Sequence, residues 1–302
     1  MGMLSIYDVE RILKLGRPVF WFMHDMWPLT GGCHHAFDCT KYLEKCIDCP
    51  LLHRKRDMLF CKFQFEEKYR IFSKYSNLKI IAPSTWLFHL ASTSLLFKNK
   101  QLIHIPNLCD INIFKPMGKG WAKRLFNLSE SKKLILFGAA TGGMGNIYKG
   151  WEYLQKAILH LSTSSYEAVI FGEYNKTVEK QLPIKCNFIG KLYDEYSLSV
   201  LYNAADVFVT PSLADNFPNT ILESLSCGTP VVAFNVGGIP DLIMHKSNGY
   251  LAHYKDCEDL KKGIEWCVSQ YSIQEVCRSS IIKKYSPSLI IEKHKKLMYG
   301  KI

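Results

Sequence analysis

Two carboxylates, Asp215 and Glu223, flank a short stretch that could bind a phosphorylated ligand. The stretch reads Asp-Asn-Phe-Pro-Asn-Thr-Ile-Leu-Glu and follows an apolar run at residues 207–210 that is typical of a buried strand. A helix beginning near Pro218 would expose free amide groups, which bind anions such as a diphosphate. Asp215 would precede the helix and Glu223 would lie on its second turn, so both carboxylates could accept hydrogen bonds from hydroxyl groups. Taken alone, the stretch fits a plain capped helix better.

Three other segments also lie where strands are expected to end. The turn Gly237-Gly238 follows the apolar run Val231–Phe234 and would let backbone approach a ligand closely. The loop Gly138–Lys149 ends in a lysine, which suits phosphate, and it contains three further glycines: Gly142, Gly143 and Gly145. His24-Asp25 ends the first clear strand, where a lone histidine is more often structural. Neither a Walker A loop nor the glycine fingerprint of nicotinamide enzymes is present.

Short apolar runs alternate with helical patterns along most of the chain. Such strands, apolar on both faces, indicate a parallel sheet covered on two sides, and parallel sheets bind ligands at the carboxyl ends of their strands. We expect about five or six strands after residue 130 and about three before residue 115. The breaker-rich segment Lys115–Gly120 predicts a boundary, giving an N-terminal domain at 1–116 and a C-terminal domain at 117–302.

The chain has 302 residues and a net charge of +11, which would suit nucleic acid, anionic lipid or phosphorylated substrates. Its basic residues are dispersed in small groups, which argues against a nucleic-acid binder. The group Lys293–Lys296 stands beside Leu297, Met298 and Tyr299, a pattern that could rest on an anionic membrane. No apolar run approaches the roughly 20 residues of a membrane span, and no secretory signal is evident. These features predict a cytoplasmic protein, with peripheral contact at the inner membrane face as an option.

Eleven cysteines, mostly scattered, are typical of reduced intracellular thiols. Four of them cluster within 17 residues and end in a C-x2-C pair, a set that suits a tetrahedral structural zinc ion: Cys33, Cys39, Cys46 and Cys49. His34 and His35 could substitute as ligands. Four reduced thiols in an irregular loop are the alternative.

Taken together and in order, these segments resemble the retaining glycosyltransferases of family 4, which have the GT-B fold of two Rossmann-like doubly wound domains. The resemblance rests on these residues of the C-terminal half: Ala204-Ala205-Asp206, Thr210-Pro211-Ser212, Asp215 to Glu223, Cys227-Gly228-Thr229-Pro230-Val231-Val232 and Gly237-Gly238-Ile239-Pro240-Asp241. Upstream, it includes Ala82–Leu87, Ile105-Pro106-Asn107 and Lys149-Gly150. The segment from Trp21 to Pro50 is similar to a subfamily found in polysaccharide biosynthesis. The resemblance covers nearly the whole chain.

The resemblance implies a role for each matching position. His24, Asp215 and Lys149 would be catalytic: His24 near the sugar and the leaving group, Asp215 on the transferred sugar, and Lys149 on the donor diphosphate. Glu223 would hold the ribose, and the donor would also meet Asn216, Phe217, Asn219, Thr220 and Gly238. The reaction would transfer a hexose-type sugar from a UDP- or GDP-sugar to a glycan or lipid-linked acceptor, with retention and without a metal, in capsule, exopolysaccharide or O-antigen synthesis. A terminal helix would pack back on the N-terminal domain.

Two departures from the family pattern bear on activity. Gly143 stands where the family has a phosphate-binding arginine, and Asp215 replaces the usual glutamate. About 100 residues of the family's N-terminal domain have no counterpart on domain-size grounds, so we expect that domain to be incomplete. A non-catalytic remnant that binds a nucleotide-sugar or a partner subunit is therefore the alternative function. A zinc-containing nucleic-acid binder and a nicotinamide oxidoreductase are weaker alternatives.

Overall fold

The computed structural model describes residues 4–139, 147–172, 182–270 and 272–300. The chain divides into two units, Met1–Pro106 and Asn107–Ile302. The sequence analysis expected the boundary after Pro116. The segment just before it belongs with the second unit because its backbone is bound there: the Cys109 amide donates to the Tyr285 carbonyl at 2.9 Å, and the Lys115 carbonyl accepts from Asn203 Nδ2 at 3.0 Å.

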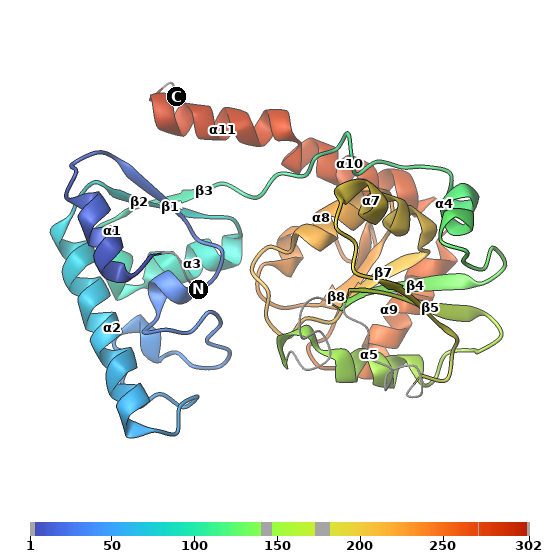
Figure 1. The fold of residues 1–302 in the computed structure, drawn as a ribbon, viewed down its shortest axis with the longest axis horizontal. Helices are drawn as coiled ribbons and strands as arrows, with labels where there is room; N and C mark the ends of the chain where they lie inside the picture. The colour runs from blue at the N-terminus through green and yellow to red at the C-terminus, as the bar shows by residue number, and fades with distance from the viewer. Residues whose placement is uncertain (1–3, 140–146, 173–181, 271, 301–302) are drawn as a thin grey trace. The chain divides into compact units, whose positions relative to one another are not determined.

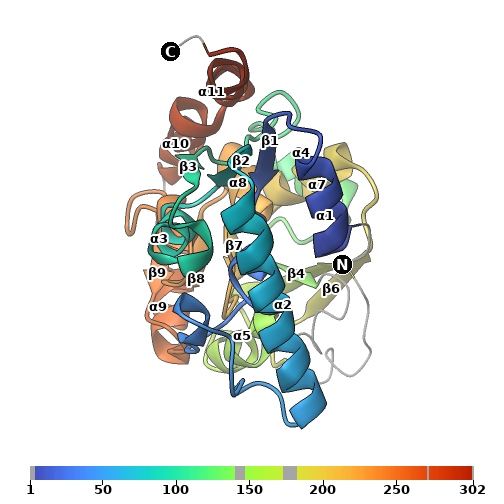
Figure 2. The same cartoon turned by 90° about the vertical axis from the view of Figure 1, so that its left-hand side faces the viewer.

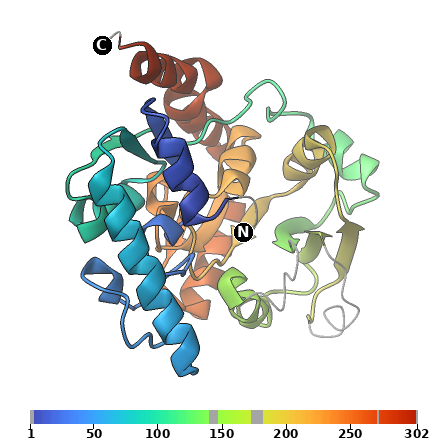
Figure 3. The same cartoon turned by 60° about the vertical axis from the view of Figure 1, so that its left-hand side comes forward.

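The N-terminal unit is built on a three-stranded parallel sheet in the order β1-β2-β3 (Figure 1). Its elements are α1 (Ile6–Leu13), β1 (Val19–Phe22), α2 (Lys55–Lys74), β2 (Leu78–Ala82), α3 (Thr85–Thr93) and β3 (Gln101–His104), with single 3-10 turns at Trp27–Leu29, Lys41–Leu43 and Leu95–Phe97. Ser5 caps α1 and Ser84 caps α3 through side-chain acceptors. Figures 2 and 3 show α2 running along the outside of this unit beside α1.

The C-terminal unit contains a six-stranded sheet, all parallel, in the order β6-β5-β4-β7-β8-β9. Its strands are β4 (Lys133–Ala139), β5 (Tyr166–Gly172), β6 (Cys186–Gly190), β7 (Val207–Thr210), β8 (Val231–Phe234) and β9 (Gly249–Ala252). Its helices are α4 (Lys119–Leu125), α5 (Trp151–Ile158), α7 (Glu195–Ala204), α8 (Asn219–Ser226), α9 (Cys257–Ser269), α10 (Ile273–Tyr285) and α11 (Pro287–Tyr299), with 3-10 turns at Ile147–Lys149 and Ile239–Asp241.

Helices cover both faces of this sheet, so its central strands are buried throughout. Residues of α7, α8 and α10 pack on one face around Leu136, Tyr202 and Phe208, whereas α5 and α9 pack on the other around Ile135 and Val232. The order of strands reverses at β4, whose neighbours β5 and β7 are reached in opposite directions along the sheet. In doubly wound sheets the ligand crevice opens at that point, beyond the carboxyl ends of the strands. The predicted arrangement of two α/β units is confirmed.

Candidate active site

The loops that follow β4, β7 and β8 meet at the carboxyl edge of the C-terminal sheet. They bring together the two oppositely charged residues expected there: Lys149 Nζ lies 3.3 Å from Asp215 Oδ2. Both side chains remain partly exposed. The three glycines Gly142, Gly143 and Gly145 of the same predicted loop lie outside the described residues.

The glycine pair after β8 holds the Asp215 backbone in place. Gly238 donates its amide hydrogen to the Asp215 carbonyl at 3.2 Å. Gly237 has a left-handed conformation, with φ of +58°, and a Cβ atom there would collide with the same carbonyl oxygen. Only glycine combines that conformation with so close an approach. The Gly-Gly turn thus has a positioning role toward Asp215 that the sequence did not reveal.

Lys149 is positioned by an equally close contact with the loop after β7. Gly150, with φ of +61°, leaves no room for a Cβ atom because the Pro211 carbonyl occupies that space. The Leu213 amide donates to the Tyr148 carbonyl at 2.7 Å on the other side of Lys149. These two contacts fix the base of the Lys149 side chain beside Asp215.

The first turn of α8 opens at the same edge. The amides of Asn219 and Thr220 cannot be satisfied within the helix, because the first four amides of any α-helix have no internal partner. Pro218 precedes them without a capping side chain, and no acidic residue occupies the first turn. Asn107 Nδ2 donates to Asn219 Oδ1 at 2.8 Å and to the Phe217 carbonyl at 3.3 Å, which steadies this helix start. The turn has the properties of an anion site.

Glu223 lies one turn further along α8, largely buried. Its Oε2 accepts a hydrogen bond of 3.1 Å from the hydroxyl of Tyr202, a side chain with no exposed surface. Burial raises the pKa of Glu223 to about 7, and the Tyr202 hydrogen bond opposes part of that rise. Burial and the neighbouring carboxylate also raise the pKa of Tyr202 well above its usual value. The sequence analysis missed Tyr202, since a tyrosine inside an apolar helix is indistinguishable from a core residue.

The remaining expected donor contacts occupy different environments. Asn216 is buried, and Phe217 packs edge-on against Tyr285 inside the core, so its side chain serves packing. His24 belongs to the N-terminal unit, where it is exposed just beyond β1 with its ring 5.2 Å from that of Phe22. Next to it, Asp25 accepts from the Trp27 amide at 2.7 Å and lies 2.5 Å from Nδ1 of His34, so His34 is engaged with a carboxylate.

Five thiols, rather than the four expected, line one cavity of about 20 Å³ in the N-terminal unit: Cys33, Cys39, Cys46, Cys49 and Cys61. Within the described ranges, no three Cys, His, Asp or Glu side chains are arranged to bind one metal ion as they stand. Burial raises the pKa of Cys33 to about 12 and that of Cys46 to about 11. The predicted zinc site therefore stays a prediction.

A fully buried lysine, Lys68 of α2, lies close to these thiols. Its ammonium donates to the carbonyls of Trp27 at 2.6 Å and Thr30 at 2.8 Å and lies 3.5 Å from the Trp27 ring centre. Burial lowers its pKa to about 7, while the nearby Cys46 and Asp25 act in the opposite direction. Lys68 thus anchors the irregular segment that carries the cysteines.

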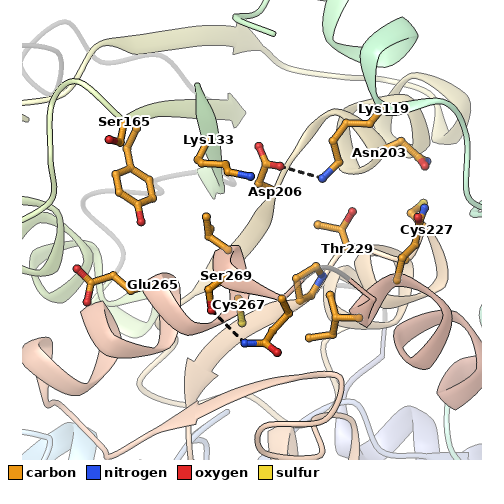
Figure 4. Close-up of a pocket in the computed structure, with 17 residues that line it drawn as sticks. Lys119, Lys133, Ser165, Asn203, Asp206, Cys227, Thr229, Glu265, Cys267 and Ser269 are labelled. Carbon is orange, nitrogen blue, oxygen red and sulfur yellow. Dashed lines mark hydrogen bonds and ion pairs between the residues drawn. The ribbon is translucent and has the colours of Figure 1, made fainter. Parts of the chain in front are cut away.

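A larger cavity of about 600 Å³ lies at the opposite, amino edge of the C-terminal sheet (Figure 4). The ion pair between Lys119 and Asp206 lies in its wall, and Ser269 accepts a hydrogen bond from Gln270. The charged atoms of Asp206 are fully engaged by Lys119, Lys123 and the Leu134 amide. Parallel sheets bind ligands at their carboxyl edge, so we assign the candidate site to the Asp215 edge.

Part of the C-terminal unit matches a known sequence family. Residues 135–270 match the sequence family described as Glycosyl transferases group 1. The chain is 30% identical over 176 residues to an uncharacterized glycosyltransferase of Methanocaldococcus jannaschii, covering 54% of this chain and 44% of that protein. It is 33% identical over 140 residues to the sulfoquinovosyl transferase SQD2 of Arabidopsis thaliana, covering 45% and 26%. The chain spans less than half the length of the first curated relatives it matches.

Among solved structures, the chain is similar to Anabaena HepE in complex with UDP, with a TM-score of 0.72 and 16% identity, covering 98% of this chain and 77% of that one. HepE has also been solved with UDP-glucose, with a TM-score of 0.69 and 17% identity, covering 97% and 77%. At this identity the likeness concerns the fold. The expected GT-B fold is confirmed.

Proposed function

We propose that the protein is a retaining glycosyltransferase of family 4 that transfers a hexose-type sugar from a nucleoside diphosphate sugar to a glycan or lipid-linked acceptor in polysaccharide synthesis. The observation that carries the proposal is the Lys149–Asp215 pair beside the open first turn of α8, with the buried Glu223 one turn behind. The cation and the free amides match the diphosphate of such a donor. The carboxylates of Asp215 and Glu223 match its sugar and its ribose.

Lys149 and the start of α8 would hold the donor diphosphate. The amides of Asn219 and Thr220 and the positive end of the helix dipole favour negative charge there. The lysine would turn from Asp215 to the phosphate oxygens when a donor binds. As the glycosidic bond breaks, charge grows on the nucleoside diphosphate, and fixed positive groups would stabilise that charge without a metal ion.

The two carboxylates would recognise the neutral parts of the donor. Glu223 has one oxygen engaged by Tyr202, so the other is available to a ribose hydroxyl. Asp215 would accept from hydroxyls of the transferred sugar, and its loop is fixed by Gly237 and Gly238. His24 is the predicted contribution of the N-terminal unit, near the sugar and the leaving group. The attacking hydroxyl would come from the acceptor, on the face that the leaving group departs from.

A donor panel tests this proposal. Thermal shift of the purified chain with UDP, GDP and their common sugars should show stabilisation by one nucleotide family, since a ligand bound only to the folded state raises its stability. Lys149→Ala should weaken that binding by about tenfold or more, as expected for loss of a charge-assisted contact. Lys156→Ala, at an exposed lysine of α5, is the matched control. No shift with any member of the panel would count against the proposal.

The alternative, a non-catalytic protein that binds a nucleotide-sugar or a partner subunit, would pass the binding test. Turnover separates the two functions. Release of UDP or GDP in the presence of a lipid-linked or glycan acceptor, lost in both Lys149→Ala and Asp215→Ala, is expected of the enzyme. Binding without release in the full panel of acceptors would favour the alternative.

We also propose that the cysteine segment binds a structural zinc ion. The five thiols already share one cavity, and the buried ammonium of Lys68 would be balanced by metal-bound thiolates. The ion would have to draw the thiols together and displace their protons. Elemental analysis should find about one zinc per chain, lost in Cys46→Ser and Cys49→Ser but kept in Cys186→Ser, a half-buried thiol of the other unit. Protein purified without zinc, and unable to take it up, would contradict this.

A further inference from the structure

Helix α2 carries apolar side chains on two opposite sides, the outer ones in its first half and the inner ones in its second half. Its inner side carries Phe65 and Phe72, both buried in the core of the N-terminal unit. Its outer side carries Leu59, Phe60 and Phe63, which are 57%, 58% and 49% exposed. A helix of one globular unit normally has a single apolar face, so the outer one has no function in packing this unit.

Helix geometry gathers the three outer side chains into one patch. With about 3.6 residues per turn, Leu59 and Phe63 are one turn apart and point the same way, and Phe60 flanks them. Phe65 and Phe72 point to the other side. Figures 2 and 3 show these first turns of α2 extending along the outside of the unit, beyond the end of α1.

Basic residues surround this outer patch. The stretch of residues 51–63 contains four basic side chains and one acidic one: Arg54, Lys55, Arg56, Lys62 and Asp57. Asp57 lies 3.7 Å from Arg56, and Glu66 of the next turn lies 3.8 Å from Lys62. Arg54 and Lys55 have no acidic partner within the described residues, so the rim of the patch is net positive. Leu51, four residues before the helix, is also 47% exposed.

We propose that this outer face of α2 docks on the surface of an anionic lipid bilayer. Exposed leucine and phenylalanine beside lysine and arginine is the composition of helices that lie in a membrane interface, where the apolar side chains enter the headgroup boundary and the cations meet lipid phosphates. None of the described helices is both long and apolar enough to cross a bilayer. The inference does not depend on the proposed activity.

The C-terminal helix α11, which the sequence analysis favoured for such a contact, is less suited to it. Its exposed apolar side chains include Leu289, Ile291 and Met298. At about 100° per residue, Ile291 and Met298 point to one side two turns apart, with the exposed Tyr299 beside Met298, and Leu289 points to the other side. The exposed apolar side chains of α11 are therefore spread along the whole helix, whereas Leu59, Phe60 and Phe63 of α2 lie within two turns, so α11 provides the comparison variant.

Co-sedimentation with vesicles tests the proposal. The wild-type chain should bind vesicles of phosphatidylcholine mixed with phosphatidylglycerol, bind pure phosphatidylcholine weakly, and bind less as salt is added. The double variant Phe60→Ser/Phe63→Ser should bind about tenfold or more weakly, because burying an aromatic side chain is a large part of interfacial affinity. Lys55→Gln/Arg56→Gln should bind several-fold more weakly. Leu289→Ser/Met298→Ser should bind as the wild type does.

The affected side chains are exposed, so the thermal midpoints of all variants should stay close to that of the wild type. Equal vesicle binding by wild type and Phe60→Ser/Phe63→Ser would overturn the proposal. Failure of the wild-type chain to bind anionic vesicles would also overturn the proposal. Sedimentation velocity tests the alternative that a second copy of the chain binds this face. A dimer that dissociates in Phe60→Ser/Phe63→Ser would show that a second copy, and not a bilayer, covers it.

Discussion

The two edges of the C-terminal sheet each carry an aspartate beside lysine, and the two groups are bound very differently. At the amino edge, Asp206 binds Lys119 at 2.9 Å through one oxygen and Lys123 at 3.2 Å and the Leu134 amide at 2.8 Å through the other. At the carboxyl edge, among the described residues, the Asp215 carboxylate pairs with Lys149 at 3.3 Å. The Lys123 side chain is 5% exposed and that of Lys149 is 34% exposed.

The difference separates stability from function. Burial alone would raise the pKa of Asp206, but the charge of Lys119 and the Leu134 amide outweigh it, and the pKa lies below its usual value. The folded protein therefore favours the ionised form of Asp206. The pKa of Glu223, at the other edge, lies well above its usual value because burial is poorly compensated. Ionisable groups whose charged form lowers the stability of the fold are typical of ligand-binding sites.

The largest effect on the unfolding free energy should come from removing the Asp206 carboxylate at the amino edge. Asp206→Ala leaves the buried ammonium of Lys123 without a carboxylate, and removing one partner of a buried pair costs about 3–5 kcal/mol of unfolding free energy. Urea unfolding at neutral pH measures it. In the wild type, the stabilisation from Asp206 is present above its unfolded pKa near 3.8 and is lost as pH falls through the lower folded value.

Asp215→Ala is the counterpart at the carboxyl edge. We expect it to change the unfolding free energy by less than about 1 kcal/mol, because a partly exposed single ion pair contributes little. It should instead weaken donor binding and turnover. Equal destabilisation by Asp206→Ala and Asp215→Ala would show that the two edges have the same structural role and that the distinction between them is wrong.

The next effect concerns the glycine that supports Asp215. Gly237→Ala places a Cβ against the Asp215 carbonyl and forces a left-handed alanine, so it should cost about 2–3 kcal/mol and displace Asp215. Gly190→Ala, at φ of +79° with open space around it, isolates the backbone strain and should cost about 1 kcal/mol. Donor binding should fall in Gly237→Ala and persist in Gly190→Ala. If the two variants behave alike, the close contact has no positioning role.

Much of this fold could be predicted from the sequence because apolar runs fix buried parallel strands directly. The limits of the apolar runs Val207–Thr210 and Val231–Phe234 are confirmed. The sequence pattern predicts a helix over about residues 63–75, whereas α2 begins eight residues earlier, at Lys55, because its first half is apolar on its outer side and does not show the periodicity of one buried face. The pattern also predicts a helix over residues 239–245, where the structure has only the 3-10 turn Ile239–Asp241, because the Asn248 side chain binds the Met244 amide and the Leu242 carbonyl.

The site could be predicted only in part, for a related reason. Lys149 and Asp215 follow different strands, and parallel-sheet topology brings strand ends together whatever the loops contain. Tyr202, Cys61 and Lys68 were missed because each lies on a helix whose pattern explains it as core or surface. Their roles depend on the residue that tertiary packing places opposite, which is Glu223 for Tyr202 and the Trp27 carbonyl for Lys68. Spacing along the chain contains no information about such pairs.

An effect of opposite sign should come from Glu223→Gln. A carboxyl whose folded pKa is near 7 and whose unfolded pKa is 4.5 destabilises the fold as it ionises, so wild-type stability should fall as pH rises from about 5 to 8. Glutamine keeps an acceptor for the Tyr202 hydroxyl and never ionises. The variant should therefore lack that fall and exceed the wild type by about 1–2 kcal/mol at pH 8, below the limit that the full pKa shift sets.

Urea unfolding at several pH values measures this difference, and Glu292→Gln, at an exposed carboxylate of α11, is the control. The same Glu223→Gln protein should bind the donor nucleotide more weakly, because an amide cannot replace a carboxylate as acceptor for the ribose hydroxyls. A residue kept for packing would give greater stability with unchanged binding. Greater stability at pH 8 together with lost binding would place Glu223 on the functional edge of the sheet, whereas a variant that is less stable at every pH would place it with Asp206.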